Sequence, residues 1–171
     1  MNTKEKLTIK NIKTFPSMEW GENGGLRCDI YLKGKKVAEY IDWGNGGEAE
    51  VRMLTDTITH KELQNLCYEA TNRLGLNSNE YSEEINYMCA IDTLVVYLQE
   101  MKDTEKMYKE KSKKGWNNLL VIKTQFNIYY CAFKDGGAKS AENYLKEKNN
   151  LTDDKIVSMN IICDQSYFEN L

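Results

Sequence analysis

The chain has a single histidine, a single proline and no long apolar run. One histidine restricts hydrolytic catalysis, because most such sites need an imidazole base beside a nucleophile or several imidazole ligands on a metal. His60 falls in the first turn of an expected helix, where a solvent-facing side chain is the ordinary case. Cys-x-x-Cys pairs, a nucleophile elbow and calcium-loop spacing are all missing. The sequence therefore predicts no catalytic residue, no metal site and no cofactor.

The longest apolar runs, Leu94–Leu98 and Leu119–Ile122, fall far short of the roughly 20 residues of a membrane span. The first ten residues, MNTKEKLTIK, lack the apolar stretch of a secretory signal. Five widely spaced cysteines suit reduced core thiols better than a disulfide framework. We expect a cytoplasmic protein without membrane association. The expected structural thiols are Cys28, Cys67, Cys89, Cys131 and Cys163.

Charge is unevenly distributed along the chain. Residues 37–105 carry 14 acidic and 4 basic side chains, a net charge of −10, although the whole chain has a net charge of only −3. Such a segment disfavours nucleic-acid binding and favours approach to a basic protein surface, although an ordinary solvated helical face is the alternative. The lysine clusters Lys33–Lys36 and Lys106–Lys114 come with few arginines and no aromatic-basic stacking motif. Direct nucleic-acid binding is therefore not expected.

The N-terminal third reads as a meander of antiparallel strands. Apolar and polar residues alternate from Leu26 to Leu32, the pattern of a strand buried on one face. Val37, Ile41 and Trp43 are expected to continue that face after the Lys33–Lys36 turn. The expected strands span residues 7–12, 26–32, 37–43 and 48–54, and Pro16 ends the first of them.

Helical periodicity begins after residue 57. Thr59 and Glu62 have capping-box spacing, and Gly75 is the expected stop of that helix. Ser82 opens a longer helix, with Glu83 and Glu84 near its positive end and lysines 109–114 toward its negative end. Its expected apolar face holds Ile85, Met88, Cys89, Ile91, Leu94, Val95, Leu98 and Met101.

The last third returns to strand chemistry, with a hairpin over 119–123 and 127–133, a helix over 138–148 and a strand over 156–163. The predicted class is α+β: an antiparallel β-hairpin meander, two central helices, then hairpin, helix and strand. A single domain over 1–171 is the preferred organisation. The alternative places a meander with a helical hairpin in 1–110 and a ββαβ unit in 111–171, because the charge changes sign near that boundary.

Two glycine-rich segments border the hairpin: Gly24-Gly25, and Gly44 to Gly47. Because glycine reaches positive φ, these rims are expected to form tight turns, with an anion-binding nest as the alternative. Trp20 and Trp43 flank the rims, and Trp43 is open between a core residue and an exposed anchor. The candidate partner-binding residues are Trp20, Asp42, Trp43, Asn45, Glu48, Glu83 and Glu84.

The segment Ile30–Ala38 followed by Asp42–Gly47 resembles a small β module in uncharacterised proteins of phages and other mobile elements. The resemblance consists of a Gly-Lys hairpin and an Asp-x-Gly-x-Gly-Gly run, and it carries no catalytic residue. It implies an accessory gene product. By analogy, it implies an inhibitor of host defence such as an anti-CRISPR protein.

Taken together, these features predict a non-catalytic accessory or inhibitor protein that engages a basic surface of a protein partner, with a host nuclease as the candidate partner. Two alternatives stay open. One is a small-molecule or nucleotide binder that uses the Gly46-Gly47 rim, and the other is an enzyme of unknown type.

Overall fold

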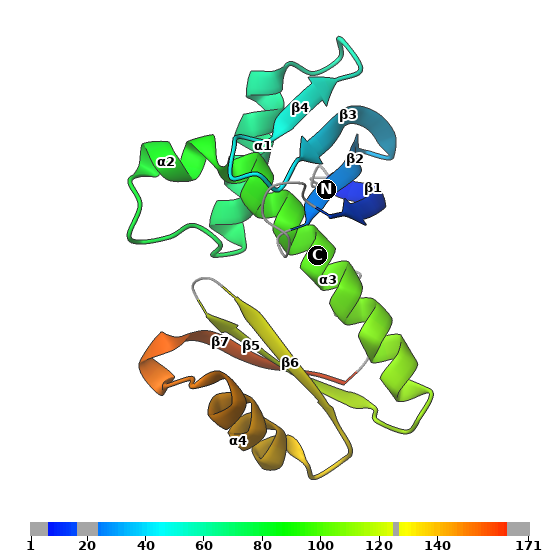
Figure 1. Ribbon diagram of the computed structural model, residues 1–171, viewed down its shortest axis with the longest axis vertical. Coiled ribbons are helices and arrows are strands. Elements are labelled where there is room, and N and C mark those ends of the chain that lie inside the picture. Colours follow the sequence, from blue (N-terminus) through cyan, green and yellow to red (C-terminus); the bar gives the residue numbers. More distant parts are fainter. Residues whose placement is uncertain (1–6, 17–23, 125–126, 164–171) are drawn as a thin grey trace, which may run out of the picture. The chain divides into compact units, whose positions relative to one another are not determined.

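The computed structural model describes residues 7–16, 24–124 and 127–163 (Figure 1). The chain separates into two compact units, Met1–Gln99 and Glu100–Leu171, each with its own antiparallel sheet. The predicted α+β class is confirmed. Among the described residues, none of the helices has the length and apolar character that a membrane crossing requires.

The sheet of the first unit is a meander in the order β1-β2-β3-β4. Its strands are β1 (Leu7–Phe15), β2 (Gly25–Leu32), β3 (Lys35–Asp42) and β4 (Glu50–Met53). Lys33 and Gly34, both with positive φ, make the tight turn between β2 and β3. As predicted, Pro16 directly follows the first strand.

One expectation for β3 is wrong. The pairing of β2 with β3 shifts register between Ile30 and Tyr31, opposite the step from Ala38 to Lys36. This irregularity changes which side chains of β3 face the core. Ala38 and Tyr40 are buried, whereas Trp43, expected on the same face as Val37, is exposed.

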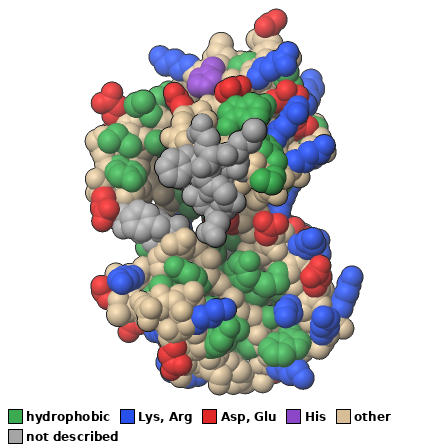
Figure 2. Space-filling view, in the orientation of Figure 1, with side chains coloured by type: hydrophobic (Ala, Val, Ile, Leu, Met, Phe, Trp, Pro, Cys, Tyr) green, Lys and Arg blue, Asp and Glu red, His purple; other side chains and the backbone are tan. Residues whose placement is uncertain are grey.

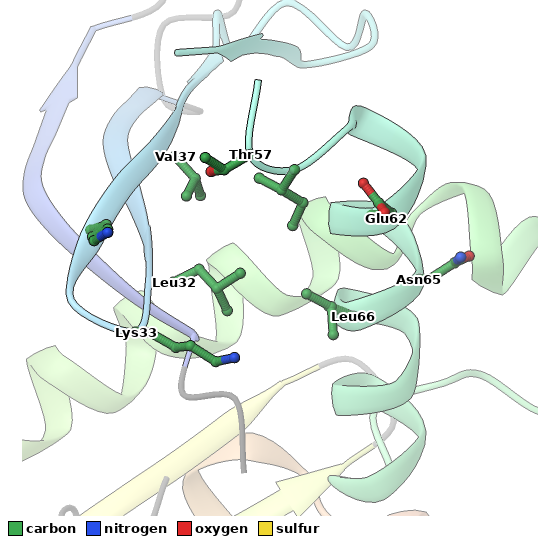
Figure 3. A pocket seen from close by; sticks show the side chains of 9 residues that line it. Leu32, Lys33, Val37, Thr57, Glu62, Asn65 and Leu66 are labelled. Carbon is green, nitrogen blue, oxygen red and sulfur yellow. The ribbon is translucent and has the colours of Figure 1, made fainter. Parts of the chain in front are cut away.

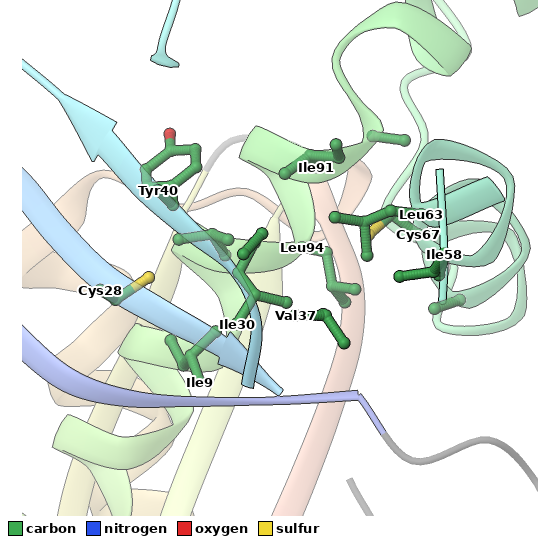
Figure 4. Close-up of a cluster of buried hydrophobic side chains, with 14 of the residues drawn as sticks. Ile9, Cys28, Ile30, Val37, Tyr40, Ile58, Leu63, Cys67, Ile91 and Leu94 are labelled. Carbon is green, nitrogen blue, oxygen red and sulfur yellow. The ribbon is translucent and has the colours of Figure 1, made fainter. Parts of the chain in front are cut away.

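The core of the first unit lies between one face of this sheet and two helices, α1 (His60–Arg73) and the start of α3 (Ala90–Ser112) (Figure 4). The sheet contributes Ile9, Cys28, Ile30, Val37 and Tyr40, the two helices contribute Leu63, Cys67, Ile91 and Leu94, and Ile58 comes from the segment before α1. These residues lie far apart in the sequence, so their burial joins the meander and the helices into one core.

The other face of the sheet carries an ion-pair network. The Lys36 Nζ atom lies 3.0 Å from Asp29 Oδ1 and 2.8 Å from Glu39 Oε1, and Asn11 Nδ2 donates to Asp29 Oδ2 over 2.6 Å. Partial burial opposes ionisation of Asp29, but these donors outweigh it and hold the pKa of its carboxyl below the ordinary value. Glu39, an acidic residue of the predicted negative segment, is therefore neutralised within the fold.

Helix α1 begins and ends as predicted. Thr59 N donates to Glu62 Oε2 over 2.7 Å, and Glu62 N donates to Thr59 Oγ1 over 3.2 Å, which completes the capping box. Gly75, with a φ of 62°, follows the C-cap residue Leu74.

The prediction of one long helix from Ser82 is wrong, because the helix breaks at Cys89 into α2 (Glu83–Met88) and α3. The Gln64 side chain of α1 donates hydrogen bonds to the carbonyls of Tyr87 and Met88, the second over 3.0 Å. The last carbonyl groups of α2 thus accept hydrogen bonds from a side chain of a neighbouring helix, and α2 ends at this point. As a result Ile85, Met88 and Cys89 are exposed instead of buried.

All five cysteines lie in the described ranges and none forms a disulfide, but they do not all lie in the core. Cys28 and Cys67 are buried as expected, and Cys131 is partly buried. Cys89 and Cys163 are exposed, the first because it lies at the break between α2 and α3 and the second because it directly follows the last strand.

The second unit has a three-stranded sheet in the order β6-β5-β7. Its elements are β5 (Asn118–Thr124), β6 (Ile128–Phe133), α4 (Ala138–Asn149), a 3₁₀ turn η1 (Asp153–Lys155) and β7 (Ile156–Ile162). Leu120 and Ile122 pack with α4 on one face, and Leu119 and Val121 pack with Tyr108 of α3 on the other. The central strand is thus buried on both faces, as its continuous apolar run indicates.

Candidate functional site

The loop between β3 and β4 contains two turns, and each is closed by a hydrogen bond to a side-chain oxygen. Asp42 Oδ1 accepts a hydrogen bond from Gly44 N over 2.8 Å, and Asn45 Oδ1 accepts one from Gly47 N over 3.0 Å. Gly44 and Gly46 have φ values of 67° and 75°, a region that favours glycine. The tight-turn interpretation of this rim is therefore confirmed, and two predicted site residues, Asp42 and Asn45, shape the loop.

Trp43 is an exposed aromatic residue with a fixed orientation. Its side chain is 49% exposed, its indole N–H donates to Glu50 Oε1 over 3.1 Å, and its ring centroid lies 5.9 Å from that of Phe15 in an edge-on arrangement. The sequence leaves open whether Trp43 is a core residue or an exposed residue, and in the structure it is exposed. Because the ring is held on two sides, contact with a partner would cost it little conformational entropy.

The Gly24-Gly25 rim does not use the positive φ that was expected of it. Gly24 and Gly25 are not among the glycines with positive φ. A Cβ atom at Gly25 would lie 2.8 Å from the carbonyl oxygen of Asp42 and would overlap the Phe15 ring. Gly25 is therefore needed for space, because it lets the Phe15 ring of β1 lie against the backbone of β2 where Phe15 supports Trp43.

Asp92 of α3 lies within electrostatic range of this loop. Burial raises the pKa of its carboxyl; a hydrogen bond from the Tyr40 hydroxyl opposes that rise, and the charges of Asp42 and Glu48 add to it. Burial and the neighbouring Asp92 carboxylate in turn raise the pKa of Tyr40. Carboxylates from two distant segments thus share one environment.

We use the name acidic rim for Asp42, Trp43, Glu48, Glu50 and Asp92. Glu48 and Glu50 are exposed and Asp92 is partly buried. Within the described ranges, no ion pair involves any of the four carboxylates. The rim thus combines an exposed aromatic side chain with carboxylates, and it offers hydrogen-bond acceptors and a ring to a basic partner.

The sequence missed Glu50, Asp92, Tyr40 and Phe15. No local pattern links these residues to Asp42 or Trp43, since strand pairing and helix packing bring them together from four separate elements. The only sequence signal was the acidic excess of residues 37–105, which does not indicate which carboxylates meet.

Among the described residues, the predicted site residues Asn45, Glu83 and Glu84 do not belong to the acidic rim. Trp20 lies outside the described residues. Glu83 and Glu84 are exposed in the first turn of α2, which Tyr87 fixes to α1 through a 2.8 Å hydrogen bond from its hydroxyl to Asn65 Oδ1. In the part of the chain that the structure describes, no hydrogen bond or ion pair joins either glutamate to the rim.

Three other acidic residues of segment 37–105 are engaged by contacts within the protein. Glu39 pairs with Lys36, Glu62 caps α1, and Glu105 lies 2.6 Å from the ammonium of Lys109. On the face shown in Figure 2, acidic side chains are dispersed among lysines and arginines. The charge argument is therefore carried by the acidic rim and not by the whole segment.

A separate groove of about 510 Å³ lies between the tip of the β2–β3 hairpin and α1 (Figure 3). Leu32, Val37 and Leu66 give it an apolar wall, and Glu62 and Lys33 lie at its border. Gly46 and Gly47 do not line it. The groove therefore adds nothing to the alternative of a small ligand bound at the Gly46-Gly47 rim.

Reactive groups are not assembled in the described ranges. His60 is exposed at the first position of α1. Burial, with a contribution from the charge of Asp92, raises the pKa of the Cys67 thiol to about 12, so this buried sulfur stays protonated and unreactive at neutral pH. Among the described residues, no three His, Cys, Asp or Glu side chains are grouped to hold a metal ion.

Comparison with models of protein families, with curated proteins and with solved structures finds no match for this chain.

Proposed function

We propose that this protein is a non-catalytic binding protein that presents its acidic rim to a basic surface of a protein partner. The observation that carries the proposal is Trp43, which is half exposed yet held by Glu50 and Phe15 among carboxylates without a described ion pair. Ordered aromatic residues of this kind are the usual energetic centres of protein interfaces.

Electrostatics supports a cationic partner group. The raised pKa of Asp92 reflects burial and mutual repulsion with Asp42 and Glu48. An arginine or lysine placed beside the Trp43 ring would relieve that repulsion and add a cation–π contact. Complementary charge of this kind also accelerates association and makes it sensitive to salt.

A more specific form of the proposal is an inhibitor of a host nuclease, encoded by a phage or mobile element. Its support is the resemblance of residues 30–38 and 42–47 to modules of such proteins, together with the rim chemistry. Nucleic-acid channels of nucleases are lined with lysine and arginine, because they bind phosphates. An acidic, aromatic surface is suited to occupying such a channel.

The test measures binding of the protein to a panel of purified CRISPR nucleases by biolayer interferometry at low and high salt. Two variants remove the same charge: Glu48→Gln with Glu50→Gln at the rim, and Glu83→Gln with Glu84→Gln on α2. We expect the rim variant to weaken binding about tenfold, equivalent to ~1.4 kcal/mol, and to reduce its salt dependence. The α2 variant should bind like the wild type.

Equal effects of the two variants, or binding indifferent to salt, would count against the acidic rim as the binding surface. Failure to bind any nuclease of the panel removes the nuclease form of the proposal.

A further inference from the structure

The last strand, β7, is an edge strand of the second sheet among the described residues. Its sequence, IVSMNII, contains no charged residue and no proline. Edge strands of monomeric proteins usually carry such residues, because they prevent pairing with other chains. Within the described ranges, no strand pairs with the outer edge of β7.

Three apolar side chains at alternate positions of β7 are exposed, although the pairing with β5 shifts register between Lys123 and Thr124 and places no residue of β5 opposite Val157. Val157 is 60% exposed, Met159 42% and Ile161 50%. Met159 pairs with Ile122 and Ile161 with Leu120, so both lie on the face of the sheet that α4 covers. Helix α4 packs mainly against β6 and β5, and the side chains of Val157, Met159 and Ile161 stay exposed.

The order of residues in β7 is symmetric about Met159. Counting outward from it in both directions gives first a polar pair, Ser158 and Asn160, and then an apolar pair, Val157 and Ile161. In an antiparallel pair, opposite residues lie on the same face. A strand symmetric in this way matches a second copy of itself in antiparallel orientation.

We propose that β7 pairs antiparallel with β7 of a second copy of this chain, about a two-fold axis at Met159. The two three-stranded sheets then join into one continuous sheet. Val157 lies opposite Ile161 of the second copy, and the two Met159 side chains meet at the axis. A strand that pairs with β7 must carry alternating apolar residues and no charge, and β7 itself is such a strand. This inference does not depend on the proposed function.

Mass measurement by light scattering, from low to high micromolar concentration, tests the pairing. We expect the wild type to have the mass of two chains at high concentration and Met159→Lys to have the mass of one, because the substitution places two ammonium groups together at the axis. Tyr130→Lys is the matched control. Tyr130 is a similarly exposed apolar residue on β6, at the other edge of the same sheet, and this variant should dimerise like the wild type.

Disulfide formation tests the register without relying on a charge substitution. In a background with Cys89→Ser and Cys163→Ser, mild oxidation should cross-link Met159→Cys to itself. Val157→Cys should cross-link to Ile161→Cys when the two are mixed, but not to itself. A monomeric wild type, a dimer that Met159→Lys leaves intact, or self-cross-linking of Val157→Cys would each overturn the proposal.

Discussion

Truncation of Leu63 to alanine is expected to lower the free energy of unfolding of the first unit by about 2–5 kcal/mol. Leu63 is fully buried on α1, in the cluster that joins the sheet to the start of α3. Its removal leaves a cavity in the contact on which the position of α1 depends. Urea unfolding followed by circular dichroism measures the loss.

The matched control for this prediction is Leu66→Ala on the same helix. Leu66 is only partly buried and lines the groove beside the hairpin, so its truncation exposes little new cavity surface. We expect a clearly smaller loss. If the two variants lose the same stability, α1 does not pack on the sheet as described.

Alanine at Gly25 is expected to destabilise the fold by about 1–3 kcal/mol and to disturb the acidic rim. The added Cβ would overlap the Phe15 ring and crowd the carbonyl of Asp42, so Phe15 must move away from Trp43. Urea unfolding gives the stability. In a background with Trp20→Phe and Trp116→Phe, a red shift of the remaining tryptophan emission reports the change at Trp43.

Gly47→Ala separates this steric effect from a general need for glycine. Gly47 lies in the neighbouring loop without positive φ, and a Cβ there would approach only the side chain of Asn45, at 3.0 Å. Its stability and tryptophan emission should stay close to those of the wild type. A Gly25→Ala protein that behaves the same way would show that Phe15 does not support Trp43.

Features that depend on neighbouring residues could be predicted from the sequence. Alternation of apolar and polar residues identified β2, and the Thr59–Glu62 spacing identified the start of α1. In both cases the determining contacts lie within one strand or one helical turn.

Features that depend on distant residues could not be predicted. The break at Cys89 requires Gln64 of another helix to bond the carbonyls of Tyr87 and Met88. The β-bulge that buries Tyr40 and exposes Trp43 depends on strand pairing. Asp92 joins the acidic rim through packing of α3 on the sheet, and no sequence spacing encodes that contact.

The central claim is that carboxylates from the β3–β4 loop and from α3 form one electrostatic unit at the acidic rim. The raised pKa of Asp92 determines whether the stability of the fold rises or falls with pH. Folding raises the pKa of Asp92, so as pH increases the carboxyl loses its proton in the unfolded chain before it does in the folded protein. The free energy of unfolding therefore falls as pH rises from the ordinary aspartate pKa of about 3.9 through the raised pKa.

The most direct measurement is an NMR titration of the Asp92 side-chain carboxyl in the wild type and in a variant with Asp42→Asn and Glu48→Gln. We predict a pKa above the ordinary aspartate value in the wild type and a lower pKa in the rim variant, whereas Glu83→Gln with Glu84→Gln leaves it unchanged. An Asp92 that titrates at its ordinary pKa, or that does not respond to neutralisation of Asp42 and Glu48, would contradict this account.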